Sequence, residues 1–284
     1  MRMSPRIVVV SIAVLWVGAC DRPALLRQMD KVGLVNNIQH QLLESVEDEK
    51  SAVLATTDAE SADFAAQSKR SAEEIEQSKT RLAELITADA RPDEVEKLAT
   101  FDARWNELKA IDARLLDLAV ANSNVKAAHL LAQEGSAALD RFITSVDAMT
   151  LACSDVAVVR SLATAATSVA RIQSLLLVHI PEASDAEMTT LEARIQRLGA
   201  TVDAALREAG PSIPSTASSA AADGAQAWAD YQRVAAEVIR LSRLNTNVIS
   251  VDVSIHEKRT ATRACLDALG ELRSAIQGGP HATR

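Results

Sequence analysis

The sequence predicts an all-α protein made of two tandem up-down-up-down four-helix bundles joined by a long shared helix. Composition is the first reason: the 284 residues include 2% aromatic side chains, nine glycines and seven prolines, and alanine, leucine, glutamate and arginine dominate, as is typical of long packed helices. The second reason is that apolar residues recur at helical spacing over long stretches. The third is an internal repeat, which indicates that one helical unit occurs twice.

The repeat appears when the sequence is shifted by 123 residues, without gaps. Trp105 then aligns with Trp228, and Asn122 aligns with Asn245. Further pairs at the same offset are Val35/Val158, Val46/Val169, Ser51/Ser174, Leu54/Leu177, Leu118/Leu241, Asn124/Asn247 and Val125/Val248. Two copies are too few for a solenoid. We therefore expect two packed modules, residues 28–147 and residues 148–278.

Apolar spacing predicts three helices for the first module, over residues 24–55, 60–86 and 92–133. Thr57 and Asp58 offer capping side chains between the first two helices. Pro92, which is followed by acidic residues, suits the first turn of the third helix. Gly135 marks a weak boundary or a kink.

The two modules are expected to share a helix over residues 137–178, because this stretch contains neither proline nor glycine. Such a helix would be about 60 Å long. Pro181 ends it, and Ser184 with Glu187 predicts the cap of the next helix. Residues 210–224 form the longest loop candidate, residues 225–256 and 259–277 the last two helices, and residues 279–284 a flexible tail.

The N-terminus has the pattern of a secretory signal. Arg2 and Arg6 precede an apolar run, which ends in Val-Gly-Ala directly before Cys20. This end resembles the bacterial lipobox, which implies a signal peptide over residues 1–19, a lipidated Cys20 and a short tether over residues 20–27. Acyl chains would then anchor the protein to the lipid bilayer. The alternative is an ordinary signal peptide with a chance cysteine.

The residue after Cys20 bears on location. Asp21 resembles the signal that keeps lipoproteins of enteric bacteria in the inner membrane. The prediction is a lipid-anchored protein of the cell envelope on the periplasmic face of a membrane, with the inner membrane favoured.

In such an oxidising compartment Cys153 and Cys265 suggest a disulfide. Two buried free thiols are the alternative.

Charge and motifs exclude several function classes. A net charge of −8 argues against a nucleic-acid partner. The five histidines lack the Glu-x-x-His spacing of di-iron bundles, and the sequence lacks C-x-x-C-H, H-E-x-x-H, G-x-S-x-G and phosphate-binding glycine loops. We therefore expect no enzyme activity, no cofactor and no metal site.

Three stretches resemble the four-helix-bundle sensor domain of methyl-accepting chemotaxis receptors. They are residues 46–58 (VEDEKSAVLATTD), 115–119 (LLDLA) and 122–127 (NSNVKA), with a divergent second copy at 238–248 (VIRLSRLNTNV). The resemblance covers residues 28–145 well and 150–277 more weakly. Those receptors have flanking transmembrane helices and continue into HAMP and cytoplasmic signalling helices. We expect a lipid in place of the first anchor, and a detached sensor module that needs a partner.

The resemblance implies ligand-holding arginines and amides on the bundle helices. The ligand-binding candidates are Asn122, Asn124, Lys126, Arg171, Gln173, Arg243, Asn245 and Asn247. Each has a structural alternative. A buried asparagine often sets the register of a bundle, and charged residues often lie on a solvated face. Trp105 and Trp228 are expected to pack in the core at equivalent places.

The function predicted is that of a membrane-anchored periplasmic lipoprotein with a chemoreceptor-like sensor module. The module would bind a small solute, such as a carboxylate or an amino acid, or a membrane signalling partner, either a receptor or a kinase. A homodimer is one expected form of the protein. The alternative is a structural or adaptor lipoprotein that interacts through its helices and has no small ligand.

Overall fold

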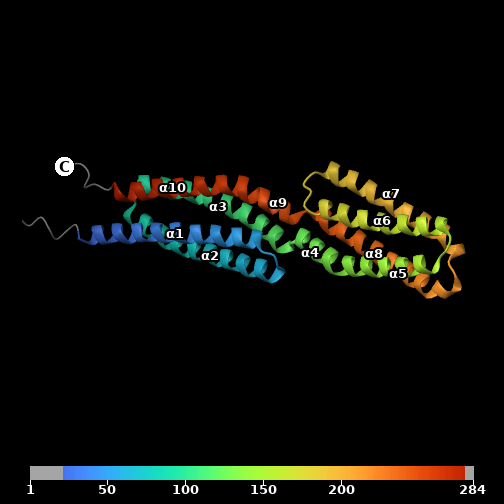
Figure 1. Cartoon of the computed structure of the whole chain (residues 1–284). Helices are drawn as coiled ribbons and strands as arrows, with labels where there is room; N and C mark the ends of the chain where they lie inside the picture. The colour runs from blue at the N-terminus through green and yellow to red at the C-terminus, as the bar shows by residue number, and fades with distance from the viewer. Residues whose placement is uncertain (1–21, 279–284) are drawn as a thin grey trace, which may run out of the picture. The chain divides into compact units, whose positions relative to one another are not determined.

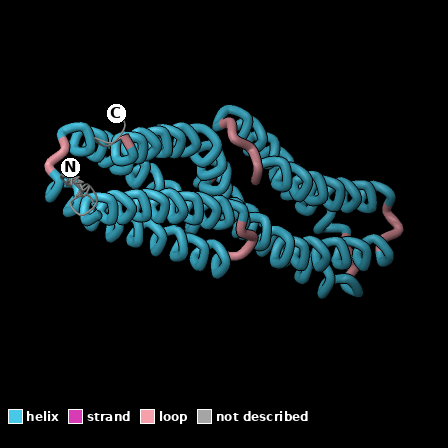
Figure 2. Tube along the Cα trace, turned by 90° about the vertical axis from the view of Figure 1, so that its left-hand side faces the viewer, coloured by secondary structure: helices cyan, strands magenta, loops and turns pink. Residues whose placement is uncertain are grey.

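The computed structural model describes residues 22–278, and this part of the chain consists of helices and the turns between them (Figures 1 and 2). The described residues contain no strand. The predicted all-α fold class is confirmed. The predicted signal peptide, Cys20, Asp21 and the tail at 279–284 lie outside the described residues.

Ten α-helices follow one another in the described part of the chain. They are α1 (Arg22–Leu54), α2 (Asp58–Asp89), α3 (Pro92–Ala121), α4 (Ser123–Leu130), α5 (Ser136–Ala152), α6 (Val156–His179), α7 (Asp185–Ala209), α8 (Ser218–Leu244), α9 (Thr246–Val253) and α10 (Arg259–Gln277). Two π-helical turns, η1 (Leu131–Gly135) and η4 (Ser254–Lys258), and two 3-10 turns, η2 (Gly210–Ser212) and η3 (Ser215–Ala217), complete the order. The two π-helical turns are related by the offset of the sequence repeat.

Several helices begin where the sequence predicts. Thr57 caps the start of α2: the Glu60 N–H donates to Thr57 Oγ1 at 3.2 Å, and the same hydroxyl donates to the Glu60 carboxylate at 3.0 Å. Pro92 is the first residue of α3. Ser184 caps α7 by accepting the Glu187 N–H.

The continuous helix predicted over residues 137–178 is wrong. Helix α5 ends at Ala152, and α6 begins only at Val156. Cys153 and Asp155 between them have extended backbones, with ψ of 133° and 118°. The physical reason is the Asp155 side chain, which accepts the Ala157 N–H at 2.8 Å and so caps a new helix without any proline or glycine.

The structure also divides the chain differently from the predicted modules. Of the described residues, unit 1 takes 22–44, 70–106 and 263–278, and unit 2 takes 45–69 and 107–262. Each unit therefore combines segments from both copies of the repeat. The predicted division at residues 147/148 assigned each copy to its own bundle, which is not the grouping that the structure shows.

Unit 1 contains segments of α1, α2, α3 and α10. Its interior holds a salt-bridge cluster in which Lys31 Nζ lies 2.6 Å from both Asp89 and Glu94. Arg91 extends this cluster by donating to the Ala275 carbonyl of α10 at 3.0 Å. Trp105 is fully buried, as predicted. These contacts bring the last described helix against the first three.

In unit 2 helices α5, α6, α7 and α8 pack around an apolar core. Trp228 lies in this core as predicted, with ring centroids 6.2 Å from Phe142 and 6.1 Å from Tyr231. Helix α6 is long and apolar enough to cross a membrane by length and composition. It packs against α7 and α5 here, as a core helix does.

The predicted disulfide is not observed among the described residues. Cys153 follows α5 in unit 2, and Cys265 is buried in α10 in unit 1. Both cysteines lie in residues 148–278, which the sequence assigns to one module. The grouping of residues 263–278 with unit 1 removes that premise.

Candidate functional site

Asn122 and Asn245 interrupt the long helices at equivalent points of the repeat. Both have a left-handed backbone, with φ of 52°, which asparagine tolerates better than most residues. Each side chain accepts a hydrogen bond from the second asparagine of the other copy: Asn124 Nδ2 donates to Asn245 Oδ1 at 2.9 Å, and Asn247 Nδ2 donates to Asn122 Oδ1 at 2.7 Å. The predicted Asn-x-Asn pairs therefore come together in unit 2.

The backbone around these asparagines is paired in the same reciprocal way. Ser123 N–H donates to Thr246 Oγ1 at 2.9 Å, and Thr246 N–H donates to Ser123 Oγ at 3.1 Å. Asn124 and Asn247 exchange N–H to Oδ1 bonds of 3.0 and 3.1 Å. Each short helix, α4 and α9, thus has its first amides capped by the other. We call residues 122–124 and 245–247 the asparagine clasp.

The clasp bears on four predicted ligand residues. The amide groups of Asn122, Asn124, Asn245 and Asn247 bind one another across two helix breaks, which favours the interpretation that they set helix pairing. Lys126 lies at the edge of the clasp, where its Nζ donates to the Ala121 carbonyl at 2.8 Å.

Arg243 is held in an ion-pair network rather than left for a ligand. Its Nε donates to the Glu192 carboxylate at 2.6 Å, and this bond is the main cause that lowers the pKa of Glu192. The same carboxylate lies 3.0 Å from Nε2 of the buried His179, whose Nδ1 lies 2.8 Å from Ser242 Oγ. Ser242 is fully buried. The network ties α6, α7 and α8 together.

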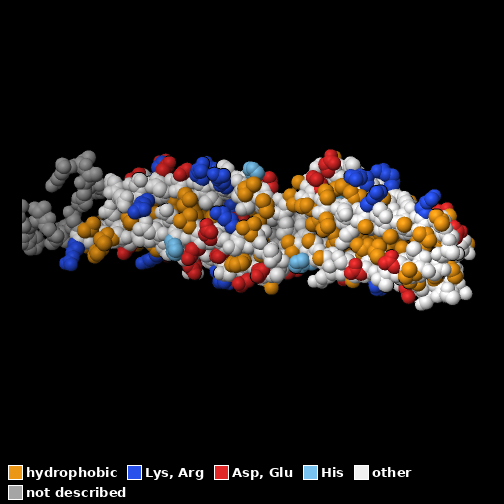
Figure 3. Space-filling view, in the orientation of Figure 1, with side chains coloured by type: hydrophobic (Ala, Val, Ile, Leu, Met, Phe, Trp, Pro, Cys, Tyr) orange, Lys and Arg blue, Asp and Glu red, His pale blue; other side chains and the backbone are white. Residues whose placement is uncertain are grey.

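The structure separates the two remaining candidates from each other. Gln173 accepts a hydrogen bond from Tyr231 Oη at 2.8 Å in the core. Arg171 instead lines a groove of about 640 Å³ between α6 and α7, together with the exposed Arg194 and Arg197. Basic side chains gather over α7 in Figure 3. This groove is an open, cationic surface.

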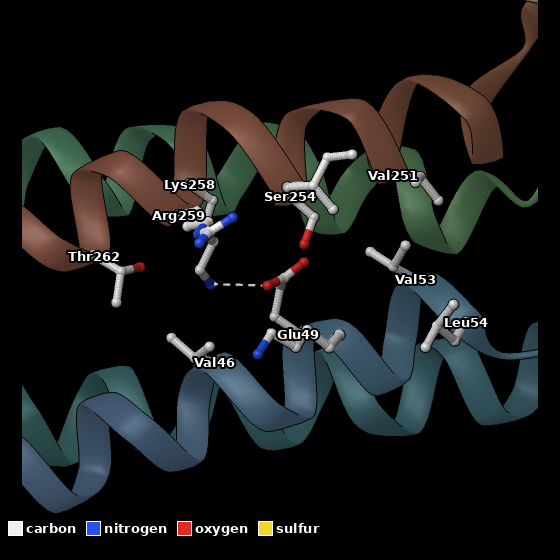
Figure 4. Close-up of a pocket in the computed structure, with 11 residues that line it drawn as sticks. Val46, Glu49, Val53, Leu54, Val251, Ser254, Lys258, Arg259 and Thr262 are labelled. Carbon is white, nitrogen blue, oxygen red and sulfur yellow. Dashed lines mark ion pairs between the residues drawn. The ribbon is translucent and has the colours of Figure 1, made fainter.

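A different site in unit 2 combines a cavity with buried charge. A cavity of about 440 Å³ lies between the end of α1 and the segment from α9 to the start of α10 (Figure 4). We call it the charged pocket. Its lining residues are Val46, Glu49, Lys50, Val53, Leu54, Val251, Ser254, Ile255, Lys258, Arg259 and Thr262.

Three buried charges meet beside this pocket. Glu49 is fully buried, and Lys258 is 2% exposed. Lys258 Nζ lies 3.4 Å from Glu49 Oε2 and 2.5 Å from Asp112 Oδ1. Burial raises the pKa of the Glu49 and Asp112 carboxyls, and the Lys258 charge opposes this rise. We call Glu49, Asp112 and Lys258 the buried triad.

The π-helical turn η4 positions the cation of the triad. A π-helical turn changes the direction in which side chains leave a helix, and such turns are frequent at functional sites. Lys258 is the last residue of η4 and Ser254 is the first. In Figure 4 the Ser254 hydroxyl points toward the Glu49 carboxylate, so both ends of the turn face the same acidic group.

The repeat supplies a comparison for this site. At the offset of 123 residues the counterparts are apolar or lack a side chain: Ile172 for Glu49, Ala235 for Asp112 and Gly135 for Lys258. We call these three the counterpart site. Ile172 is 2% exposed and Ala235 is 7% exposed, and both belong to the apolar core of unit 2. The fold therefore does not require charges at this place.

Sequence reasoning missed the buried triad, although a signal was present. The triad belongs to no known motif, and its charged residues do not occur in both copies as the asparagines do. A charged residue in one copy that aligns with a core residue in the other is the opposite pattern. At the offset of 123 residues, Glu49 aligns with Ile172 and Asp112 aligns with Ala235, so the sequence contains this pattern.

Comparison with known proteins agrees with the sequence resemblance. Residues 27–159 match the family model described as a four helix bundle sensory module for signal transduction. The matched stretch includes Glu49, Asp112 and the first half of the clasp. No curated protein and no solved structure matches the chain. The resemblance to a chemoreceptor sensor bundle is thereby confirmed for residues 27–159.

Proposed function

We propose that this chain is a lipid-anchored sensory module of the cell envelope, which binds a small solute in the charged pocket and reports it to a membrane signalling partner. One observation carries the solute site. The buried charges of Glu49 and Lys258 line a cavity with branched aliphatic walls, at a place where the counterpart site is ordinary core. Because burying charge is unfavourable, the triad has a use other than packing.

The pocket has the size and chemistry of a solute site. Its volume lies within the range of about 300–1,000 Å³ typical of small-molecule sites, which are mostly apolar with a few convergent polar groups. The fully buried Glu49 carboxylate has Lys258 Nζ 3.4 Å from its Oε2, and Thr262 Oγ1 has no hydrogen-bond partner among the described residues. Buried polar atoms normally make close hydrogen bonds, which supports a role for both groups in holding a ligand.

The proposed anchor and partner rest on other features. Acylation of Cys20 would hold the protein at a membrane, and Asp21 favours the inner membrane, where receptors and kinases reside. Leu25, Leu26 and Met29 at the start of α1 are all more than half exposed, which suits contact with a bilayer or a partner helix near the anchor. The partner is a receptor, a kinase or a second copy of the chain.

An adaptor without a solute is the second candidate, and one observation favours it. The asparagines that resemble ligand groups are engaged in the clasp, so these residues explain helix pairing without any ligand. In this alternative the helical surfaces bind another envelope protein directly.

A thermal-shift screen of the purified protein against amines, amino acids, organic acids and alcohols tests the proposal. A ligand at 100 times its Kd adds about 2.7 kcal/mol of stability, so we expect a clear rise in Tm. Val53→Trp fills the charged pocket and should abolish the shift, whereas Arg171→Gln in the α6–α7 groove should not. A screen without any hit would favour the adaptor.

Anchoring is tested separately. Cys20→Ser should move the protein from the membrane fraction to the soluble fraction. Retention of the variant with membranes to the same extent as the parent would refute a lipid anchor at Cys20.

A further inference from the structure

We infer that the solute of the charged pocket is a small apolar monoamine, that is, a protonated primary amine on an aliphatic or aromatic body. This inference rests on the proposed function of that pocket. It follows from the charge balance of the buried triad, from the acceptor atoms at the pocket floor and from the apolar walls.

With both carboxyl groups ionised, the buried triad carries one negative charge in excess. Two carboxylates share one ammonium, and the ammonium lies close to only one of them: Lys258 Nζ is 2.5 Å from Asp112 and 3.4 Å from Glu49. Charge-assisted hydrogen bonds are usually about 2.7–2.9 Å long. Glu49 is therefore the carboxylate that lacks a close positive partner, and one added monocation would neutralise the cluster.

The Glu49 carboxylate is the group of the pocket floor that is left for a ligand head group, because the Lys258 ammonium beside it is paired with Asp112 at 2.5 Å. The Glu49 side chain is fully buried, and the nearest positive charge, Lys258 Nζ, lies 3.4 Å from its Oε2. The Ser254 hydroxyl points toward it (Figure 4). An ammonium has three donors and no acceptor, so it matches a carboxylate with a neighbouring hydroxyl. A carboxylate ligand would meet like charge at this floor.

The walls of the pocket suit an apolar body. Branched aliphatic side chains line them: Val46, Val53, Leu54, Val251 and Ile255. Leu54 and Ile255 are 74% and 53% exposed. A ligand with an aliphatic or aromatic group would cover both side chains, and burial of apolar surface stabilises binding by about 25 cal/mol per Å².

The cations at the pocket edge limit the ligand to one positive charge. Lys50 and Arg259 line the pocket and both are exposed. Lys50 is 54% exposed and lies 3.8 Å from Glu47. Water and salt screen exposed charges, so these two act weakly on an ammonium at the floor. A second ammonium would lie beside them at the mouth, so we expect diamines to bind more weakly than monoamines.

Titration calorimetry of the full chain with four probes of similar size tests the inference. The probes are phenethylamine, 2-phenylethanol, 3-phenylpropionate and 1,5-diaminopentane. We expect phenethylamine to bind at least tenfold more tightly than the other three. Glu49→Gln should weaken phenethylamine binding at least tenfold, because it removes the charge and keeps the shape.

The matched control is Glu47→Gln, which makes the same change on the exposed face of α1, where Glu47 is 78% exposed. It should leave phenethylamine binding within twofold of the parent. If Glu49→Gln does not fold, as judged by circular dichroism, Glu49→Asp replaces it in the test. This variant keeps the carboxylate but shortens the side chain by one methylene, so it should weaken phenethylamine binding at least threefold.

The outcomes separate this inference from the proposed function. Preferred binding of the alcohol or the acid, abolished by Val53→Trp, would overturn the amine and leave the solute pocket standing. Equal binding of phenethylamine to the parent and to Glu49→Gln would also overturn it. Absence of binding by all four probes and by the wider screen would overturn both.

Discussion

The two π-helical turns make the most informative comparison in the molecule. Both occur at the same point of the repeat, and both follow a left-handed asparagine and a short helix. In η4 the last residue is Lys258, which meets two acids beside a cavity. In η1 it is Gly135, where an added Cβ would lie 3.0 Å from the Leu131 side chain and 3.5 Å from that of Val234. The same backbone thus carries a charged site in one place and close packing in the other.

The difference shows which features belong to the fold and which are additions to it. The helix break, the clasp and the π-helical turn recur in both copies, so they are part of the architecture. The buried triad occurs in one copy of the repeat, and the other copy has Ile172, Ala235 and Gly135 at the same positions. Replacement of a buried ionic cluster by apolar residues is often neutral or stabilising, so the triad is better explained by binding than by stability.

The largest effect is expected from removing the one cation of the triad. Lys258→Met leaves Glu49 and Asp112 buried without a positive partner, and breaking a buried ion pair in this way lowers the free energy of unfolding by about 3–5 kcal/mol. Urea denaturation at pH 7 measures it. Lys97→Met is the control, because that exposed pair with Glu271 contributes about 0–1 kcal/mol. Equal effects of the two variants would contradict a charged interior.

Converting the triad toward the counterpart site should act in the opposite direction. The triple variant Glu49→Ile, Asp112→Ala and Lys258→Met replaces all three charges with apolar side chains of the kind found at the counterpart. We expect a gain of about 1–4 kcal/mol in the free energy of unfolding together with loss of amine binding. A triple variant that is less stable than the parent would show that the charges hold the fold together.

The clasp should respond equally in both copies, unlike the pocket. Asn245→Ala loses the hydrogen bond from Asn124 and places alanine in a left-handed backbone, so we expect a loss of about 2 kcal/mol. Asn122→Ala should lose the same amount. Asn245→Gly should lose less stability than Asn245→Ala, since glycine adopts positive φ without strain. Thermal denaturation of the three variants decides it, and clearly unequal alanine effects would argue against a symmetric clasp.

The smallest effect concerns pH. Because the pKa of Glu49 is raised above its ordinary value of 4.5 in the folded state, the folded chain binds that proton more tightly than the unfolded chain. The contribution of Glu49 to stability is then greatest below pH 4.5 and is lost as the pH rises through the folded pKa. Glu49→Gln should remove this loss, with a gain of about 1 kcal/mol at pH 8 and little change at pH 4. The pH dependence of urea denaturation measures it, and an equal change at both pH values would contradict the raised pKa.

Much of the fold follows from local sequence signals. Helix starts at Thr57, Pro92 and Ser184 depend on side chains within a few residues, and the repeat offset follows from aligned identities. The break at 153–155 escaped prediction because it depends on one capping aspartate rather than on proline or glycine. The grouping of residues 263–278 with unit 1 escaped it because tertiary packing, not local propensity, decides which helices become neighbours.

The candidate site was predictable only in part. The Asn-x-Asn pairs were found because asparagine stands out in apolar helices, although their left-handed backbone was not foreseen. The local sequence around Glu49, Asp112 and Lys258 has no feature that marks a site. Only the folded chain brings these distant residues together. Their charge becomes visible as unusual once the alignment with Ile172, Ala235 and Gly135 is made.

The composition of unit 1 has a consequence for how the chain is made. Gln28 of α1 donates a hydrogen bond of 2.7 Å to the carbonyl of Ile276, 248 residues later. Unit 1 therefore cannot reach its final form until residues 263–278 have been synthesised, whereas the segments of unit 2 are complete by residue 262. Such distant contacts form slowly and leave apolar surface exposed meanwhile. During synthesis, residues 22–44 of α1 must therefore wait for residues 263–278 before their buried face is covered.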